Sequence, residues 1–129
     1  MNRKYPSNAN LIFRVDNIQP ILLIKEMSAS RAFYRDILGF TEAEWGTNNF
    51  SFFFRDKSGI YLCSEGQGNP GTWVWIGIEG DIEVLYNSLK GKGVKIRQPP
   101  VRYSYAVEMH IEDPDGNVLR LGADPNVKI

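Results

Sequence analysis

The chain has 129 residues, of which 43% are hydrophobic and 23% are charged, the usual composition of a globular protein. Its 15 Lys and Arg balance its 15 Asp and Glu, so no net charge attracts nucleic acid or an anionic membrane, and we expect neither partner. No apolar run reaches the length of a membrane span, and the single Cys63 cannot form an internal disulfide, so we expect one cytoplasmic domain.

The first half of the chain predicts a strand followed by a helix. Residues 1–16 are expected to form an N-terminal extension, with a short extra strand at residues 11–15. Residues 18–24 are continuously apolar, which is typical of a strand buried on both faces. Ser28 is predicted to cap the N-terminus of a helix, and Gly39 is predicted to end it.

A β-hairpin is predicted next, from residues 50–55 and 60–64 on either side of an Asp-Lys-Ser-Gly turn. The second half then repeats the order of the first. It predicts a strand, a helix and a second hairpin, at residues 73–78, 82–90, 107–112 and 118–121. Gly91 and Gly93 are predicted to end the second helix.

Loops are predicted at residues 66–72, between the halves, and at residues 97–104. The repeated order predicts an α+β fold built from two tandem modules, at about residues 17–65 and 72–123, within a single domain over residues 1–129.

Three segments resemble the vicinal oxygen chelate superfamily, which joins glyoxalase I, extradiol dioxygenases, fosfomycin-resistance enzymes and bleomycin-resistance proteins. They are ILLIKEMSASRAFYRDILGF, GIEGDIEVLYNSLKGKGV and EMHIEDPDGNVLRLG, and the likeness covers residues 17–123 in order and spacing. The resemblance implies two βαβββ modules that form a curved mixed sheet around a cavity, with the helices on the outer face. It also implies a homodimer.

Enzymes of this superfamily usually hold a divalent metal on four side chains, mostly His and Glu. By position, the resemblance places these ligands at Gln19, Cys63, Trp73 and Arg120. Tryptophan offers no lone pair in the plane of its ring, and a guanidinium repels a cation. We therefore expect no metal and no cofactor, which favours the metal-free, bleomycin-resistance-like branch.

The turn chemistry predicts which residues of the second hairpin share a face. Asp-Pro-Asp-Gly-Asn favours a type I turn with a glycine bulge, which pairs Asp113 with Asn117. One face then carries Glu108, His110 and Arg120 towards the cavity, and the core face carries Met109, Ile111, Leu119 and Leu121.

The same phasing is applied to the first hairpin. It turns five side chains towards the cavity: Ser51, Phe53, Arg55, Tyr61 and Cys63. It turns four others into the core: Phe52, Phe54, Ile60 and Leu62.

These faces give a set of candidate ligand-binding residues: Gln19, Phe53, Tyr61, Cys63, Trp73, Glu108, His110 and Arg120. His110 is the only histidine and is either a general base beside Glu108 or a bonded or exposed side chain without a catalytic role. Arg120 either anchors an anionic ligand or forms an internal ion pair with Glu108 or Glu112.

The aromatic candidates have two interpretations. Trp73 and Trp75, with Phe53 and Tyr61, form either an aromatic wall for a ligand or ordinary core and dimer contacts. Cys63 is expected to be a small buried residue rather than a nucleophile.

Two functions are expected from this reasoning. The first is a metal-free protein that binds a small molecule, such as an antibiotic or a metabolite, with no catalytic residue. Bleomycin itself is not expected, because capture of a cationic drug favours an acidic protein and this chain is neutral. The second is a glyoxalase-like lyase or isomerase, or an extradiol-type dioxygenase, that uses a divalent metal. A purely structural module would have no pocket.

Overall fold

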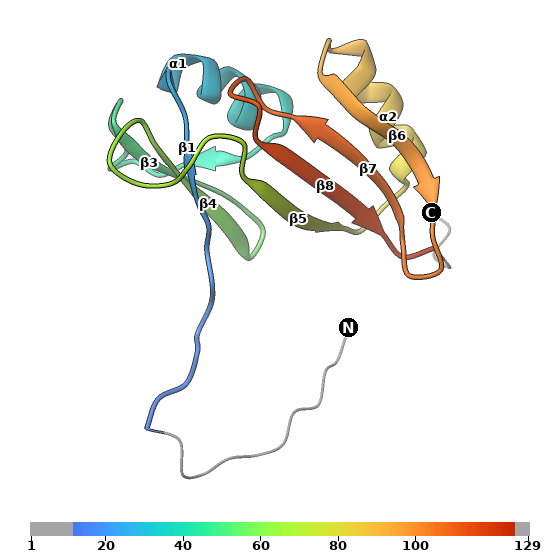
Figure 1. The fold of residues 1–129 in the computed structure, drawn as a ribbon, viewed down its shortest axis with the longest axis horizontal. Coiled ribbons are helices and arrows are strands. Elements are labelled where there is room, and N and C mark those ends of the chain that lie inside the picture. The colour runs from blue at the N-terminus through green and yellow to red at the C-terminus, as the bar shows by residue number, and fades with distance from the viewer. Residues whose placement is uncertain (1–11, 126–129) are drawn as a thin grey trace.

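The computed structural model describes residues 12–125 and consists of two four-stranded sheets, each with one helical segment against it (Figure 1). The first module contains β1 (Ile21–Leu23), α1 (Met27–Ser30), η1 (Arg31–Ile37), β2 (Thr41–Glu42), β3 (Phe50–Arg55) and β4 (Ser58–Cys63). The second contains β5 (Trp73–Ile78), α2 (Ile82–Gly91), β6 (Lys95–Arg102), β7 (Val107–Glu112) and β8 (Val118–Ala123). No helix within residues 12–125 is long and apolar enough to cross a membrane.

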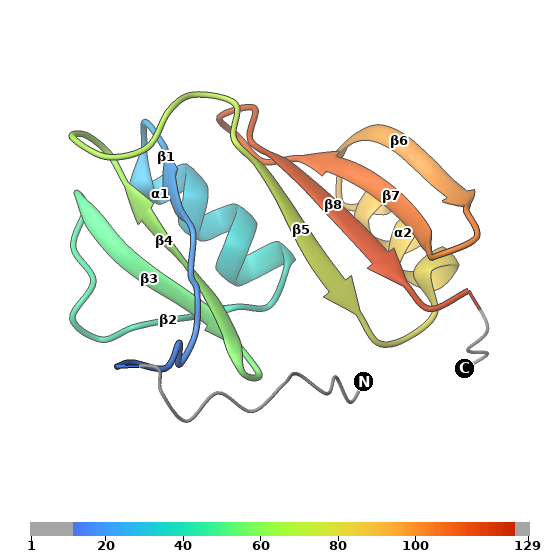
Figure 2. The ribbon, with the colours of Figure 1, turned by 60° about the horizontal axis from the view of Figure 1, so that its bottom comes forward.

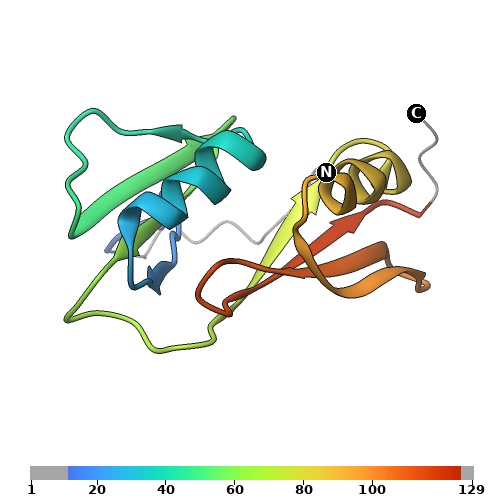
Figure 3. The same ribbon diagram turned by 90° about the horizontal axis from the view of Figure 1, so that it is seen from above.

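The two sheets have the same topology, which confirms the predicted α+β fold of two tandem modules. Their strand orders are β1-β4-β3-β2 and β5-β8-β7-β6, visible as two separate sheets in Figure 2. In each, the first strand runs parallel to the fourth and the other pairs are antiparallel, so the sheets are mixed. Seen from above, one helical segment lies against each sheet (Figure 3). The sheets do not close into a barrel.

The N-terminal strand is shorter than predicted. Only Ile21–Leu23 of the apolar run at 18–24 forms a strand. Residues 12–15 form none, and they lead away from both modules, so that none of the described strands lies beside them to pair with their backbone (Figure 1). That part of the prediction is wrong, and Leu11 lies outside the described residues.

The first helix begins at Met27, so Ser28 is not its N-cap. Glu26 occupies the cap position and makes no side-chain cap bond. From Arg31 the helix continues with the wider coil of a π-helix, in which the Leu38 amide donates to the Phe33 carbonyl at 3.0 Å. Gly39 follows with a φ of +78°, which confirms the predicted glycine end of the helix.

The first hairpin has a different turn from the predicted one. Arg55 pairs with Ser58, because Asp56 itself takes a φ of +55° and the connection is only two residues long. This moves the register by an odd number of residues and therefore exchanges the faces of one strand relative to the other.

Because of this register, the predicted orientation of Phe53 towards the cavity is wrong. Phe53 pairs with Ile60 and is fully buried on the helix side, with its ring 6.2 Å from that of Tyr34. Ser51 is buried on the same side. Phe52 instead pairs with Tyr61 on the face that no helix covers, so its predicted place in the core is wrong, and Phe54 shares that face.

The structure of the second module agrees better with the prediction made from the sequence. The hairpin register pairs Glu108 with Gly122 and His110 with Arg120, as predicted. Met109, Ile111, Leu119 and Leu121 are buried in the core. The predicted loop at 97–104 is wrong for its first part, because Lys95–Arg102 forms the edge strand β6. Its pairing is irregular between Gln98 and Val101, where two prolines supply no amide donor.

A buried polar contact joins the first helix to the second hairpin. The Tyr34 hydroxyl donates to an Asp113 carboxylate oxygen at 2.7 Å, and both side chains are buried. Burial and the negative charge of Asp113 raise the pKa of the Tyr34 hydroxyl well above its ordinary value, so it remains a donor.

Replacement of Tyr34 by Phe should lower the free energy of unfolding by about 1.5–3 kcal/mol, because a buried carboxylate loses a donor while the ring is kept. Urea denaturation measures this difference. Tyr86→Phe, on α2, is the matched control and should change stability by less than about 0.5 kcal/mol. Equal stability of the wild type and Tyr34→Phe would contradict the importance of this contact.

Candidate functional site

The helix-free face of the second sheet brings together most of the predicted site residues of that module. Trp75 on β5 pairs with Arg120 on β8, which in turn pairs with His110 on β7. Directly paired residues share a face, so the alternation along the strands adds Trp73 and Glu108 to the same surface. The three adjacent strands β5, β8 and β7 therefore present one cluster of charged and aromatic side chains.

Glu108 is the centre of this cluster. It is almost completely buried, and the Arg120 Nη2 donates to both of its oxygens, at 2.9 and 3.2 Å. The His110 Nε2 lies 2.9 Å from the first of these oxygens. Burial raises the pKa of the Glu108 carboxyl, but the bonds from His110 and Arg120 outweigh burial and hold the pKa below its ordinary value.

Of the ion pairs considered for Arg120, the one with Glu108 is present. Glu112 instead pairs with Lys95 at 3.4 Å and Arg97 at 3.5 Å. The Arg120 side chain keeps 36% of its surface exposed, and its buried Nε has no hydrogen-bond partner. Arg120 is thus held by Glu108 through one nitrogen and retains unused donors.

Two half-exposed indoles on β5 lie beside this cluster, with Trp75 against Arg120 and Trp73 against His110. Trp73 is 51% exposed and Trp75 is 49% exposed, although both belong to a regular strand. The Arg120 guanidinium lies 5.4 Å from the centre of the Trp75 ring, within the range of a cation–π contact. Trp75 lies across Gly122, where an added Cβ would meet the ring at 2.1 Å, so only glycine leaves room for the indole.

Three contacting residues of this face were not predicted. Arg97 lies over Trp73 at 5.1 Å, and Tyr105 approaches Arg120 with its hydroxyl at 3.5 Å. Lys95 contacts the neighbouring Glu112. Arg97 was missed because its segment was predicted as a loop, for which no face can be assigned. The alternation of charged and apolar residues at 94–97 was the available signal.

The predicted site residues of the first module are arranged differently. Tyr61 lies on the helix-free face with Phe50 and Phe52, at centroid distances of 5.3 and 4.6 Å. Cys63 is buried, and its thiol donates to the Glu65 carbonyl at 2.8 Å. Gln19 is half-buried just before β1. Phe53 is part of the core and does not face a site.

The four positions that correspond to metal ligands do not form a suitable donor set. Gln19 and Cys63 belong to the first module, and Trp73 and Arg120 belong to the second. An indole offers only an N–H donor, and Arg120 is a cation already bound to Glu108. Within residues 12–125, no three His, Cys, Asp or Glu side chains are grouped so that they could hold a metal ion. The side chains at these four positions therefore do not fit a divalent metal ion.

Two hollows occur away from these faces. One, of about 510 Å³, is lined by residues of η1 and β2 and by the following loop, including Arg31, Arg35 and Glu42. The other, of about 490 Å³, lies at the start of α2 and includes Asp81 and Arg102. Neither is lined by any of the predicted site residues.

Solved structures with the same fold have different functions. An antibiotic-binding protein, TnmS3 from Streptomyces sp. CB03234, superposes with a TM-score of 0.75 at 16% identity, over 87% of this chain and 98% of its own. A lactoylglutathione lyase from Agrobacterium tumefaciens gives 0.72 at 16% identity, over 84% and 94%. A superfamily member from Sphaerobacter thermophilus gives 0.71 at 20% identity, over 85% and 98%. No curated protein sequence matches the chain.

At these identities the structural likeness shows the fold alone, and the family follows from the sequence. The pattern of one superfamily matches residues 14–121, which include every strand and helix except the end of β8. The chain belongs to the Glyoxalase/Bleomycin resistance protein/Dioxygenase superfamily.

Proposed function

We propose that this protein binds a small molecule without a metal, as members of the bleomycin-resistance-like branch do, and that the ligand lies on the helix-free face of the second sheet. The observation that carries the proposal is the Arg120–Glu108 pair beside two half-exposed tryptophans, with Trp75 against Arg120 and Trp73 against His110. A ligand with a flat ring and an oxygen acceptor fits this surface best, because it satisfies both the indoles and the free guanidinium donors.

The energetics of the face support a binding role. A tryptophan buries roughly 150–250 Å² when it is covered, so Trp73 and Trp75 offer a large apolar area that the chain itself leaves open. Arg120 is oriented beforehand by Glu108, so little side-chain entropy is lost when it binds an acceptor. The antibiotic-binding neighbour is a precedent for such a role on this fold.

The enzymatic alternative is less well supported. The lactoylglutathione lyase neighbour shares the fold, and the His110–Glu108 contact at 2.9 Å resembles a base with its orienting carboxylate. However, Glu108 is also bound to Arg120, and the positions of the family's metal ligands carry Trp73 and Arg120. We therefore propose no catalytic residue.

We also propose a homodimer. The helix-free faces carry exposed aromatic side chains, and the segment before β1 exposes Ile12, Phe13, Val15 and Ile18. Apolar surface of this extent is typical of an interaction surface.

Arg120 should contribute directly to the binding of an aromatic anion such as 2-naphthoate. Arg120→Met alone should also destabilise the fold, because it leaves the buried Glu108 carboxylate without its cation. We therefore compare Glu108→Gln with the double variant Glu108→Gln/Arg120→Met. The double variant should bind 2-naphthoate at least about tenfold more weakly at similar thermal stability. Titration followed by the indole resonances of Trp73 and Trp75 measures the affinities, and equal affinities would contradict the proposal.

The purified protein should contain well under one Zn, Ni, Mn or Fe ion per chain, because two of the four expected ligand positions carry an indole and a guanidinium. Elemental analysis of protein prepared without chelators measures this content. A stoichiometric metal that is lost on replacement of Gln19 or Cys63 would favour the enzymatic alternative.

Sedimentation equilibrium should give about twice the chain mass of 14.7 kDa, since a stable interface of more than about 1,000 Å² is expected. Phe13→Asp/Val15→Asp should weaken the dimer if the exposed N-terminal side chains belong to the interface. A monomer at high micromolar concentration would rule out the proposed assembly.

A further inference from the structure

A hollow of about 510 Å³ lies at the edge of the first sheet, between η1, the edge strand β2 and the loop that follows β2. Its volume is within the range of about 300–1,000 Å³ that is usual for small-molecule sites. Its charged lining consists of Arg31, Arg35, Glu42 and Glu44, so that two positive charges balance two negative ones. A ligand without net charge is therefore favoured.

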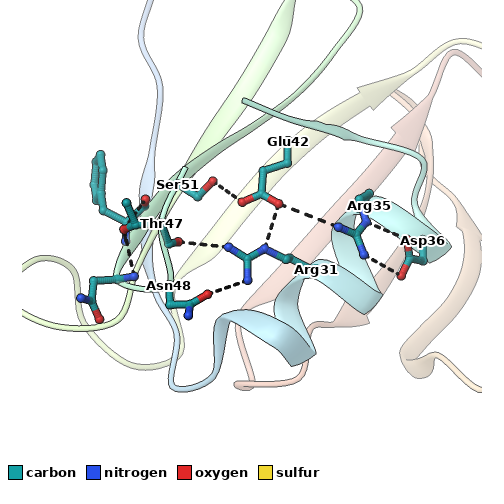
Figure 4. A network of polar contacts seen from close by, with 9 residues as sticks. Arg31, Arg35, Asp36, Glu42, Thr47, Asn48 and Ser51 are labelled. Atoms are coloured by element: carbon teal, nitrogen blue, oxygen red, sulfur yellow. Dashed lines mark hydrogen bonds and ion pairs between the residues drawn. The ribbon is translucent and has the colours of Figure 1, made fainter. Parts of the chain in front are cut away.

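The local structure brings two guanidinium groups to the same carboxylate. Arg31 and Arg35 are four residues apart in η1 and therefore project from the same side of this helix. Glu42 pairs with the buried Phe53 in the sheet, so its side chain faces the helix. The Arg31 Nε donates to the Glu42 Oε1 at 2.8 Å, whereas the Arg35 Nη1 lies 4.0 Å from the same oxygen (Figure 4).

Glu42 is held in place as an ionised acceptor. Its second oxygen accepts a bond from the buried Ser51 hydroxyl at 2.7 Å. Burial raises the pKa of the Glu42 carboxyl, but the bonds from Arg31 and Ser51 outweigh burial and lower the pKa. Arg31 is fixed in turn, since it also donates to the Asn48 side chain at 2.8 Å and to the Thr47 carbonyl at 3.2 Å.

Arg35 is oriented by a different carboxylate. Its Nε and Nη2 donate to the two oxygens of Asp36, at 2.8 and 3.3 Å, which leaves Nη1 directed towards Glu42 (Figure 4). The Arg35 side chain keeps 48% of its surface exposed, so a molecule in the hollow can reach the guanidinium.

The gap between Arg35 and Glu42 defines the chemistry of the group that fills it. At 4.0 Å the two atoms are too far apart for a direct hydrogen bond, but one oxygen at about 2.8 Å from each fits between them. That oxygen must accept from Arg35 and donate to Glu42, because a guanidinium has no acceptor and an ionised carboxylate has no donor. A carboxylate cannot donate and an ammonium group cannot accept. A hydroxyl does both, in the place that a bridging water would otherwise occupy.

We propose that this hollow is a second binding site, for an uncharged polyhydroxy compound of the size of a monosaccharide, with one hydroxyl bridging Arg35 and Glu42. Phe40 supplies an apolar part of the lining, against which the C–H groups of a sugar ring can pack. Asp36 is a positioning residue, because it acts on the ligand only through Arg35. The inference does not rest on the proposed function of the second sheet.

The test uses the methyl α-pyranosides of glucose, galactose and mannose as probes, with tetrahydropyran and acetate as controls. Nitrogen-15 spectra of the full-length protein follow the Arg35 Nε–H group and the backbone amides of Ala43, Glu44 and Gly46. At least one glycoside should shift these resonances saturably, with a roughly millimolar dissociation constant. Tetrahydropyran has the ring without hydroxyls and acetate cannot donate, so neither should give a saturable shift.

Arg35→Met removes the bridging donor and should weaken glycoside binding at least about fivefold. Its thermal stability should be unchanged, because the pair with Asp36 is exposed. Arg102→Met, at an exposed arginine of β6, is the matched control and should have no effect on glycoside binding. Thr41→Trp narrows the hollow without removing the bridge, and it should also weaken binding at least about fivefold.

The positioning role of Asp36 has its own readout. Asp36→Ala should increase the fast motion of the Arg35 Nε–H group, measured by nitrogen-15 relaxation, and weaken glycoside binding. Asp36→Asn keeps an oxygen acceptor for this group and should preserve most of both properties. Unchanged mobility of Arg35 in Asp36→Ala would contradict the positioning role.

Three results would overturn the proposed site. One is the absence of a saturable shift with any of the three glycosides, which would mean that the gap holds water only. The others are equal binding of tetrahydropyran and the glycosides, and unchanged glycoside affinity in Arg35→Met. Arg35→Met should bind 2-naphthoate as the wild type does, which keeps the outcome separate from that of the Arg120 site.

Discussion

The buried carboxylate of Asp113 holds the two modules together. Besides the Tyr34 hydroxyl, it accepts bonds from the amides of Asp115 and Asn117 and from the Asn117 side chain, each at 2.9 Å. Asn117, which is fully buried, also donates to the Leu23 carbonyl and accepts from the Thr72 amide. The turn of the second hairpin is therefore bonded to β1, to the first helix and to the linker between the modules.

The same turn explains why one half of the fold was predicted better than the other. In the second hairpin Pro114 and Gly116 restrict the backbone so strongly that the register follows from sequence. In the first, the prediction assigned the left-handed conformation to Gly59, whereas Asp56 adopts it. Aspartate tolerates this conformation, and the choice depends on packing along the whole strand rather than on the turn alone. For this reason the prediction placed Phe53 on the cavity face and Phe52 in the core, whereas the structure has them the other way round.

The candidate site was predictable to a similar, partial degree. Glu108, His110 and Arg120 could be placed on one face because alternation and a known turn are sufficient for that inference. That Arg120 pairs with Glu108 rather than Glu112 depends on the position of β6, whose basic residues bind Glu112.

The π-helical coil of η1 makes the length of the first helix unusually important. Its wide turns allow the consecutive residues Phe33 and Tyr34 both to be buried, while Arg31 still reaches the loop beyond β2. Loss of one residue would let the segment tighten into an α-helix and change the positions of Arg31 and Tyr34 relative to each other. Arg31 and Tyr34 could then not both keep their partners. The length of this segment is therefore constrained by contacts made near both of its ends, through Arg31 to the loop and through Tyr34 to Asp113.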